Sequence, residues 1–262
     1  MSCRIPLRLS LMLVGLVWLF GCGVGQESGD IRPGTPEQQL EAFTNLGRVL
    51  LLQNEVAGAL SELSKAEQID PNNVEVLTYL GLAYYSRQDY PKAAAYYQKA
   101  LSIEPSKTDI HNNLGLVYMD QQQYALAKAE FEICLNDPTY ARPWLPQFNL
   151  GVIEQLQGHD KEAEAIYQRL LTLSPQYSPT YYRLGQIYFD GGDSQKAVDY
   201  LMSAVRLDPS YSDAYFLLGQ AYEKVGNKDE AAEAFGQVVV LSPNTPRAIE
   251  AQRRARQVLG FE

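Results

Sequence analysis

Residues capable of chemistry are few in this chain, and their spacing does not form a catalytic site. Three cysteines and two histidines are present, and neither His111 nor His159 has a second histidine at the spacing of a metal site. The glycine-rich phosphate loop, the HExxH zinc motif and the GxSxG nucleophile motif are all absent from the sequence. The acidic residues are spread over the exposed faces of predicted helices. The sequence therefore predicts a protein that is not an enzyme and that needs no metal or cofactor.

Cys22 is the residue whose surroundings best predict a chemical modification. A basic start with Arg4 and Arg8 leads into an apolar run at 9–20, which is too short to span a bilayer core of ~30 Å. The run ends in Leu-Phe-Gly-Cys and resembles the bacterial lipobox, in which a signal peptide is removed and the cysteine is acylated. This resemblance implies a signal peptide at 1–21 and a lipid anchor on Cys22. An ordinary signal peptide with an incidental cysteine is the alternative.

The residues after Cys22 bear on where the protein is held. Gly23 is not the aspartate associated with inner-membrane retention, so the resemblance implies an outer-membrane lipoprotein facing the periplasm. Residues 22–39 are rich in Gly, Pro and polar residues, which predicts a flexible linker. Without the leader, 20 basic and 31 acidic residues remain, a net charge of −11. This charge argues against a nucleic-acid partner, so we expect membrane contact only through the lipid.

A repeating pattern organises the rest of the chain. A glycine recurs at steps of 34, 34, 36, 34 and 34 residues, preceded each time by leucine and followed twelve residues later by alanine. These signature glycines are Gly47, Gly81, Gly115, Gly151, Gly185 and Gly219. A bulky residue follows on the second segment of each repeat, at Leu63, Tyr97, Phe131, Tyr167, Leu201 and Phe235. Glycine in a helix costs about 1 kcal/mol relative to alanine. Its recurrence therefore predicts a close approach of a neighbouring backbone, with the alanine as the small partner.

This pattern resembles the tetratricopeptide (TPR) repeat in period and in residue type at its signature positions. The resemblance implies an all-α fold, a right-handed superhelical solenoid of six helical hairpins. The hairpins are expected at residues 40–73, 74–107, 108–141, 144–177, 178–211 and 212–245. A helix in 246–262 is expected to cap the array, with Ile249, Ala255, Val258 and Leu259 on its apolar face and its arginines outward.

An irregular joint at 136–146 interrupts the array. Two additional residues and Pro138, Pro143 and Pro146 predict that the second helix of repeat 3 ends early and that the first helix of repeat 4 is delayed. Two interpretations remain open. The joint either only alters the packing between repeats, or carries a second partner site at Tyr140 and Trp144.

Four residues depart from the pattern of their repeats. Glu154 stands where the other repeats carry tyrosine or leucine, and we expect it to reach solvent or to pair with Lys161. His111 occupies a large first-helix position and is expected to be packed and hydrogen-bonded, whereas His159 is expected to be a solvated turn residue. Cys134 replaces the small alanine of other repeats and is expected to be a buried apolar residue.

The joint also narrows the family. A lipobox, six TPRs and a joint with Asp137, Pro138, Tyr140 and Pro143 that leads into Phe-Asn-Leu-Gly at 148–151 together resemble the lipoproteins of type IV pilus biogenesis. These pilotins help the pilus secretin to reach the outer membrane and assemble there. The resemblance implies a segment of the secretin, or of another envelope protein, as the partner.

The concave surface of such an array is the expected binding site, because the core signature leaves some first-helix residues free. Three asparagines two residues before the glycine suit a peptide backbone, since an amide both donates and accepts; they would alternatively cap or hydrate the helix. The expected lining is Asn45, Tyr79, Leu82, Tyr85, Asn113, Leu116, Met119, Phe148, Asn149, Val152, Tyr182, Arg183, Phe189 and Phe216. This aromatic trough suits an amphipathic helix or a peptide with bulky anchors.

The sequence thus predicts a membrane-anchored adaptor that holds a partner segment in its concave groove and assists secretin assembly. A scaffold for another envelope assembly and a regulatory subunit of an envelope hydrolase or protease are the alternatives.

Overall fold

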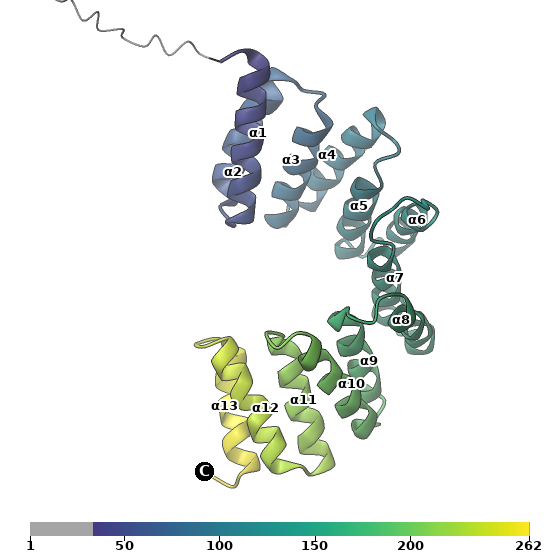
Figure 1. Cartoon of the computed structure of the whole chain (residues 1–262), viewed down its shortest axis with the longest axis vertical. Helices are drawn as coiled ribbons and strands as arrows, with labels where there is room; N and C mark the ends of the chain where they lie inside the picture. The colour runs from purple at the N-terminus through teal and green to yellow at the C-terminus, as the bar shows by residue number, and fades with distance from the viewer. Residues whose placement is uncertain (1–33, 262) are drawn as a thin grey trace, which may run out of the picture. The chain divides into compact units, whose positions relative to one another are not determined.

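The computed structural model describes residues 34–261, which form thirteen α-helices and no strand. The chain divides into Met1–Thr35 and Pro36–Glu262, and all of the helices belong to the second unit. In chain order they are α1 (Pro36–Leu52), α2 (Val56–Ile69), α3 (Val74–Ser86), α4 (Tyr90–Ile103), α5 (Thr108–Asp120), α6 (Tyr124–Leu135), α7 (Trp144–Leu156), α8 (Asp160–Leu173), α9 (Ser178–Asp190), α10 (Ser194–Leu207), α11 (Ser212–Val225), α12 (Lys228–Leu241) and α13 (Pro246–Val258) (Figure 1). The expected signal peptide and Cys22 lie outside the described residues. The all-α solenoid of hairpins expected from the sequence is confirmed.

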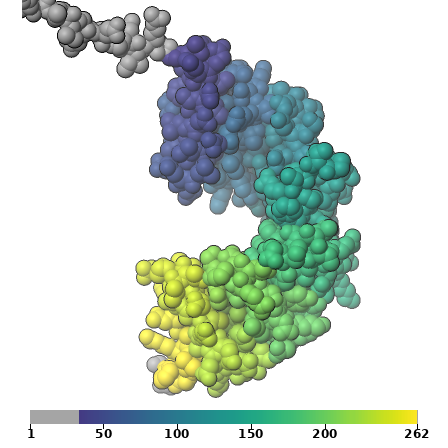
Figure 2. All heavy atoms as spheres, in the orientation of Figure 1, coloured from purple at the N-terminus to yellow at the C-terminus, as the bar shows by residue number. Residues whose placement is uncertain are grey.

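Each hairpin consists of an odd-numbered helix, here called the A-helix, and the even-numbered B-helix that follows it. The B-helix packs against its own A-helix and against the A-helix of the next hairpin. Consecutive A-helices also touch, since α3 lies against both α1 and α5, α5 against α7, and α9 against α11. The A-helices therefore share one surface of the unit, and Figure 2 shows that the unit is hollowed on one side.

The turn between the two helices of a hairpin repeats with one geometry. The residue seven positions after each signature glycine has a positive φ, between 59° and 90°, at Asn54, Gln88, Gln122, Gly158, Gly192 and Gly226. The next residue then closes the helix end, as where the Asp89 N–H donates to the Tyr84 carbonyl at 2.9 Å. A left-handed residue at this position ends the A-helix and starts the B-helix at the same place in every repeat.

The signature glycines lie against the bulky residue of the B-helix. A Cβ placed on Gly81 would lie 2.6 Å from Cε1 of Tyr97, and the other five glycines show the same contact at 2.5–2.7 Å with Leu63, Phe131, Tyr167, Leu201 and Phe235. The expected partner was wrong: a large side chain, rather than Ala93 and the neighbouring backbone, takes the space that the missing Cβ leaves. Tyr97 is only 1% exposed, so it has no room to yield.

The joint after repeat 3 has the form expected from the sequence. Helix α6 has 12 residues where the other B-helices have 14, so it ends early. Helix α7 begins at Trp144, 36 residues after the start of α5, whereas α5 begins 34 residues after the start of α3, so α7 is delayed by two residues. Pro146 falls in its first turn, where a helix leaves its N–H groups without a partner anyway.

The last helix covers the end of the array with a different face from the one expected. Ala248, Ala251 and Val258 are buried, at helical spacing, against the last hairpin. Ile249 is 65% exposed and Leu259 is 44% exposed. The expectation that these two residues belong to the covering face is therefore wrong, since Ile249 lies about 100° around the helix from Ala248.

Candidate protein-binding surface

Contacts between consecutive A-helices identify the positions that line their shared surface. The Tyr85 hydroxyl of α3 donates to Asp120 of α5 at 2.6 Å. Three repeats later, Lys224 of α11 places its Nζ 4.1 Å from the ring centre of Phe189 of α9. Both pairs join the residue four positions after one signature glycine to the residue five positions after the next. These offsets therefore face the surface common to the A-helices.

The expected groove residues differ in how much surface they present. Asn45 and Leu82 are exposed, Val152 is buried at 6% exposure, and the rest are half-buried: Tyr79, Tyr85, Asn113, Leu116, Met119, Phe148, Asn149, Tyr182, Arg183, Phe189 and Phe216. Val152 thus offers almost no area to a partner and acts as a packing residue. Leu52 and Leu156, at the ends of α1 and α7, were not expected in the lining but are 78% and 57% exposed. Their position, five residues after the glycine, is the signal that could have found them.

The aromatic residues three positions before the glycine in repeats 4 to 6 are engaged by neighbours. Phe148 meets Tyr177 edge-on at 5.3 Å between ring centres, and Tyr182 meets Tyr211 at 5.0 Å. Phe216 packs against the B-helix and lies under the Arg247 guanidinium, 5.2 Å from its ring centre. These rings therefore fill the edge of the A-helix surface, and do not stand free as the sequence suggested.

The three asparagines do not form a continuous row, because they lie in repeats 1, 3 and 4. Asn45 accepts a 3.4 Å hydrogen bond from Arg48, whereas the side chains of Asn113 and Asn149 have no hydrogen bond to any described residue. Arg183, at the same offset in repeat 5, donates to Gln186 at 3.2 Å. The amides of Asn113 and Asn149 in neighbouring repeats are thus the pair available to a peptide backbone.

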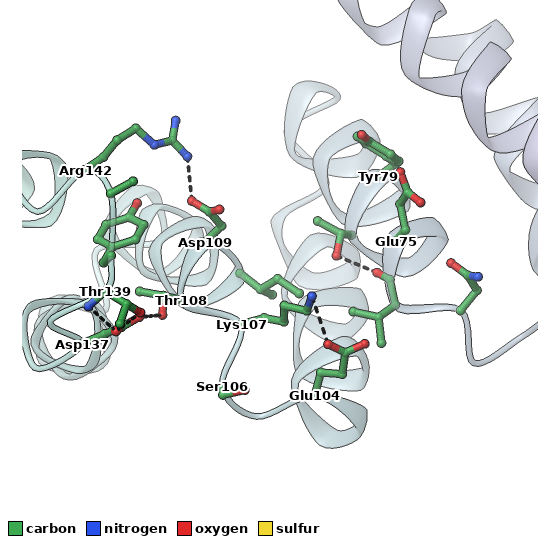
Figure 3. Close-up of a pocket in the computed structure, with 16 residues that line it drawn as sticks. Glu75, Tyr79, Glu104, Ser106, Lys107, Thr108, Asp109, Asp137, Thr139 and Arg142 are labelled. Atoms are coloured by element: carbon green, nitrogen blue, oxygen red, sulfur yellow. Dashed lines mark hydrogen bonds and ion pairs between the residues drawn. The ribbon is translucent and has the colours of Figure 1, made fainter.

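The joint forms one wall of a pocket of about 740 Å³ at the edge of this surface. Figure 3 shows Glu75 and Tyr79 on one side of it, and Asp109 with Arg142 on the other. Arg142 donates to Asp109 at 2.6 Å, and Thr108 donates to Asp137, so the joint is tied to the first turn of α5. The Thr108 and Thr139 hydrogen bonds hold the pKa of Asp137 below its usual value.

Tyr140 and Trp144, expected together as a second partner site, lie in different surroundings. Tyr140 lines the joint pocket at 9% exposure, and its hydroxyl has no hydrogen-bond partner among the described residues. Burial, and to a smaller extent the charge of Asp109, raises its pKa to about 12. Trp144 instead packs against the cluster around Tyr167 and Leu170 of α8. Of these two residues, Tyr140 lines the pocket and Trp144 does not.

Glu154 pairs with a residue that the sequence did not suggest. Its carboxylate accepts from Lys128 of α6 at 2.6 Å and contacts His159 at 2.9 Å. The expected partner Lys161 was wrong, because α6 of the preceding repeat lies alongside α7. The hydrogen bond from Lys128, ahead of that from His159, lowers the pKa of Glu154. This cluster links two repeats across the joint and presents no free charge.

The remaining unusual residues are structural. His111 contacts Glu130 at 2.6 Å and the Pro105 carbonyl at 2.9 Å, as expected for a packed histidine. Cys134 is fully buried and donates weakly to the Thr108 and Glu130 carbonyls, and burial raises its pKa to about 12. Over residues 34–261, no group of three or more His, Cys, Asp or Glu residues could hold a metal ion. None of the helices in that range is long and apolar enough to cross a membrane.

The arrangement defines a class of protein: an α-solenoid built from repeated helical hairpins. Two family models match almost the whole array, one described as "TPR repeat" at residues 47–87 and 81–122 and one as "Tetratricopeptide repeat" at 112–178 and 182–249. The chain therefore belongs to the tetratricopeptide-repeat family. TPR proteins bind protein partners and generally serve as scaffolds without enzymatic activity.

Comparison with individual proteins points toward pilus factors. The crystal structure of PilW, described as a widely conserved type IV pilus biogenesis factor, is 25% identical with a TM-score of 0.70, over 81% of this chain and 98% of that one. The pilF protein of Pseudomonas aeruginosa is 19% identical with a TM-score of 0.67, over 84% and 99% of the two chains. A TPR protein of Parabacteroides merdae is 22% identical with a TM-score of 0.70, over 86% of each chain. The last two show the fold alone.

One curated relative matches a smaller part. Tetratricopeptide repeat protein 6 of Homo sapiens is 40% identical over 57 residues, which is 22% of this chain and 11% of that protein. This match reflects the shared repeat. The resemblance to type IV pilus factors expected from the sequence is confirmed by the PilW structure.

Proposed function

We propose that the protein is a membrane-anchored adaptor that assists assembly of a type IV pilus secretin in the outer membrane. The observation that carries this proposal is the likeness to PilW, which extends over 81% of this chain and 98% of that one. A pilus biogenesis factor with a solenoid fold has one large surface to offer a partner, and here that surface carries exposed apolar residues such as Leu82 and Leu156.

The proposed lipid anchor on Cys22 and the proposed location in the outer membrane are inferred from the sequence. Acylation of Cys22 would hold the linker at the membrane, and the array would reach its partner in the periplasm. The net charge of −11 without the leader supports an array that stays away from the membrane, because an acidic array is repelled by an anionic lipid surface. The lipid, and not the repeats, would then supply the affinity for the membrane.

The experiment that tests the proposal is complementation in a piliated bacterium whose related pilus lipoprotein has been deleted. Expression of this chain is expected to restore heat-stable secretin multimers in the outer-membrane fraction. A Leu82→Asp/Leu156→Asp variant is expected not to restore them, although the protein accumulates normally. The matched control is Leu126→Asp/Leu173→Asp, which changes leucines of B-helices that are on average more exposed than Leu82 and Leu156. Wild-type accumulation without any secretin multimers would contradict the proposal.

A further inference from the structure

The first turns of the A-helices divide the array into two unlike halves. In repeats 1 to 3 the residue six positions before the signature glycine is acidic: Glu41, Glu75 and Asp109. Repeats 4 and 5 carry Leu145 and Pro179 there. Repeat 6 carries Asp213, which forms an ion pair with Arg247 of the capping helix. Only the first three repeats therefore present a run of carboxylates, here called the acidic row.

The residue three positions before the glycine changes at the same boundary. It is Thr44, Thr78 or Asn112 in the first half and Phe148, Tyr182 or Phe216 in the second. The aromatic rings fill the helix edge in repeats 4 to 6, as described above. In the first half the smaller side chains leave the edge open. A pocket of about 150 Å³ lies between α1 and α3, and the joint pocket lies between α3 and α5.

The acidic row lines both of these pockets. Glu41 and Glu75 line the smaller one, and Glu75 and Asp109 line the joint pocket. Neither Glu41 nor Glu75 forms an ion pair or side-chain hydrogen bond with a described residue, whereas Asp109 is paired with Arg142. Figure 3 shows Glu75 and Asp109 projecting from the first turns of neighbouring helices. The row thus has two unpaired carboxylates and ends at an arginine of the joint.

The charge of the joint pocket favours a cation. Its other charged residues include one ion pair, Lys107 with Glu104 at 3.1 Å, and Asp137, which accepts only from threonine hydroxyls and the Thr139 backbone. Four acids and two bases line the pocket, which leaves a net charge of −2. A ligand with positive charge is therefore attracted, and an acidic one is repelled.

Tyr140 provides a second indication of a ligand. It is 9% exposed and lines the same pocket, and its hydroxyl makes no hydrogen bond to residues 34–261, although the charges of Asp109 and Arg142 act on it. A buried hydroxyl without a partner is costly, and it can donate to a carbonyl oxygen. An extended peptide offers such a carbonyl at every residue.

We infer that the acidic row binds an extended basic segment of a partner protein, with one Lys or Arg side chain in each of the two pockets. Neighbouring helices lie about 8–10 Å apart, and a chain in the extended polyproline II conformation advances about 3.1 Å per residue and returns to the same face every three residues. Two basic residues three positions apart therefore match adjacent pockets. Arg142 is paired with Asp109, the third carboxylate of the row, so the bound segment ends before Asp109. This inference rests on the proposed role as an adaptor and specifies the chemistry of the segment that it holds.

The test is fluorescence anisotropy with the purified full chain and labelled peptides of about ten Gly, Ser and Ala residues. The probe carries two arginines three positions apart, and the control peptides carry glutamates there or adjacent arginines. We expect the probe to bind and the glutamate peptide not to bind. Glu75→Gln is expected to weaken binding about three- to tenfold, and Glu41→Gln about threefold. Glu132→Gln, an exposed carboxylate on α6, is the matched control and should leave binding unchanged.

Arg142→Gln gives a result of opposite sign. It frees Asp109 and is expected to tighten binding of a peptide with a third arginine by about threefold. Binding should weaken steeply as salt rises above about 0.15 M, since the charges are exposed. Circular dichroism of each variant checks that the helices are retained. Equal binding of the arginine and glutamate peptides, or wild-type affinity in Glu75→Gln, would overturn the inference. The adaptor proposal is tested separately, through the dependence of secretin assembly on Leu82 and Leu156. It can therefore hold even if the acidic row does not bind a basic segment.

Discussion

Tyr97 places its ring against Gly81 so closely that a Cβ on the glycine would lie 2.6 Å from Cε1. The contact joins the middle of the A-helix to the middle of the B-helix in repeat 2. Equivalent contacts recur in all six hairpins, which makes this the common element of their packing. It also predicts that replacing glycine by alanine lowers the stability at Gly81 and raises it at Gly236, a glycine without such a contact.

Gly81→Ala is expected to destabilise the array by about 1–3 kcal/mol, because the buried Tyr97 ring cannot move away from the added methyl group. Gly236→Ala is the matched control in helix α12, where an added Cβ meets nothing within 4 Å. That change should stabilise by about 0.5–1 kcal/mol through helix propensity. Urea unfolding followed by circular dichroism measures both. A stabilised Gly81→Ala protein would contradict the assigned packing.

The turn residues give a prediction about backbone strain. Gln122 has a φ of 59°, in the left-handed region where the later repeats have Gly158, Gly192 and Gly226. Gln122→Gly should therefore stabilise the chain by up to about 1 kcal/mol, since glycine adopts this conformation without a steric penalty. The reverse change, Gly192→Gln, should destabilise by a similar amount. Thermal unfolding midpoints of the two variants are expected to move in opposite directions, and a parallel shift would rule out this explanation.

The Lys128–Glu154 contact predicts a pH dependence. Because its pKa is lowered in the folded chain, the Glu154 carboxyl stabilises the fold above its ordinary range, about 4.3, and this stabilisation is lost as the pH falls through the lowered pKa. Lys128→Gln should therefore be less stable than wild type at pH 7, by about 0.5–1 kcal/mol, with a smaller difference at acidic pH. The control is Lys107→Gln, which removes an exposed pair with Glu104 and should have little effect. A difference that grows with acidification would have the wrong sign.

Cys22 gives the prediction about the anchor. Mass spectrometry of the mature protein should find Cys22 at the amino terminus with acyl chains attached, and Cys22→Ser should move the protein from the membrane to the soluble fraction. Cys134→Ser serves as the control, because that buried side chain only donates to nearby carbonyls. A mature start at another residue without lipid would contradict the anchor while leaving the array unaffected.

The sequence predicts the fold well because the repeat imposes local rules that do not depend on distant residues. Leucine, glycine and alanine at fixed offsets determine where each helix pairs, so the six hairpins follow directly. The partner of Gly81 was misassigned because spacing alone does not reveal which residue of the B-helix lies opposite. The Glu154 pair escaped prediction for a similar reason: Lys128 lies 26 residues earlier, in another hairpin.

The candidate surface was only partly predictable. Position in the repeat identified Leu82 as surface and placed Phe148 on the A-helix. It did not reveal that Phe148 packs against Tyr177, since that contact involves the loop before the next hairpin. The acidic row was visible in the sequence as an acid six residues before three successive glycines. Its significance depends on the pockets around it, which only the packed helices and the joint create.

The central claim is that the A-helix surface holds a partner segment. The most direct measurement is recovery of the secretin with purified, tagged chain from detergent-solubilised envelope, comparing wild type with Leu82→Asp/Leu156→Asp and the B-helix control Leu126→Asp/Leu173→Asp. These exposed leucines are better targets than Phe148, whose loss would disturb the core. We predict secretin with wild type and with the control, and at least about tenfold less with the A-helix variant. Equal recovery by all three proteins would contradict the account.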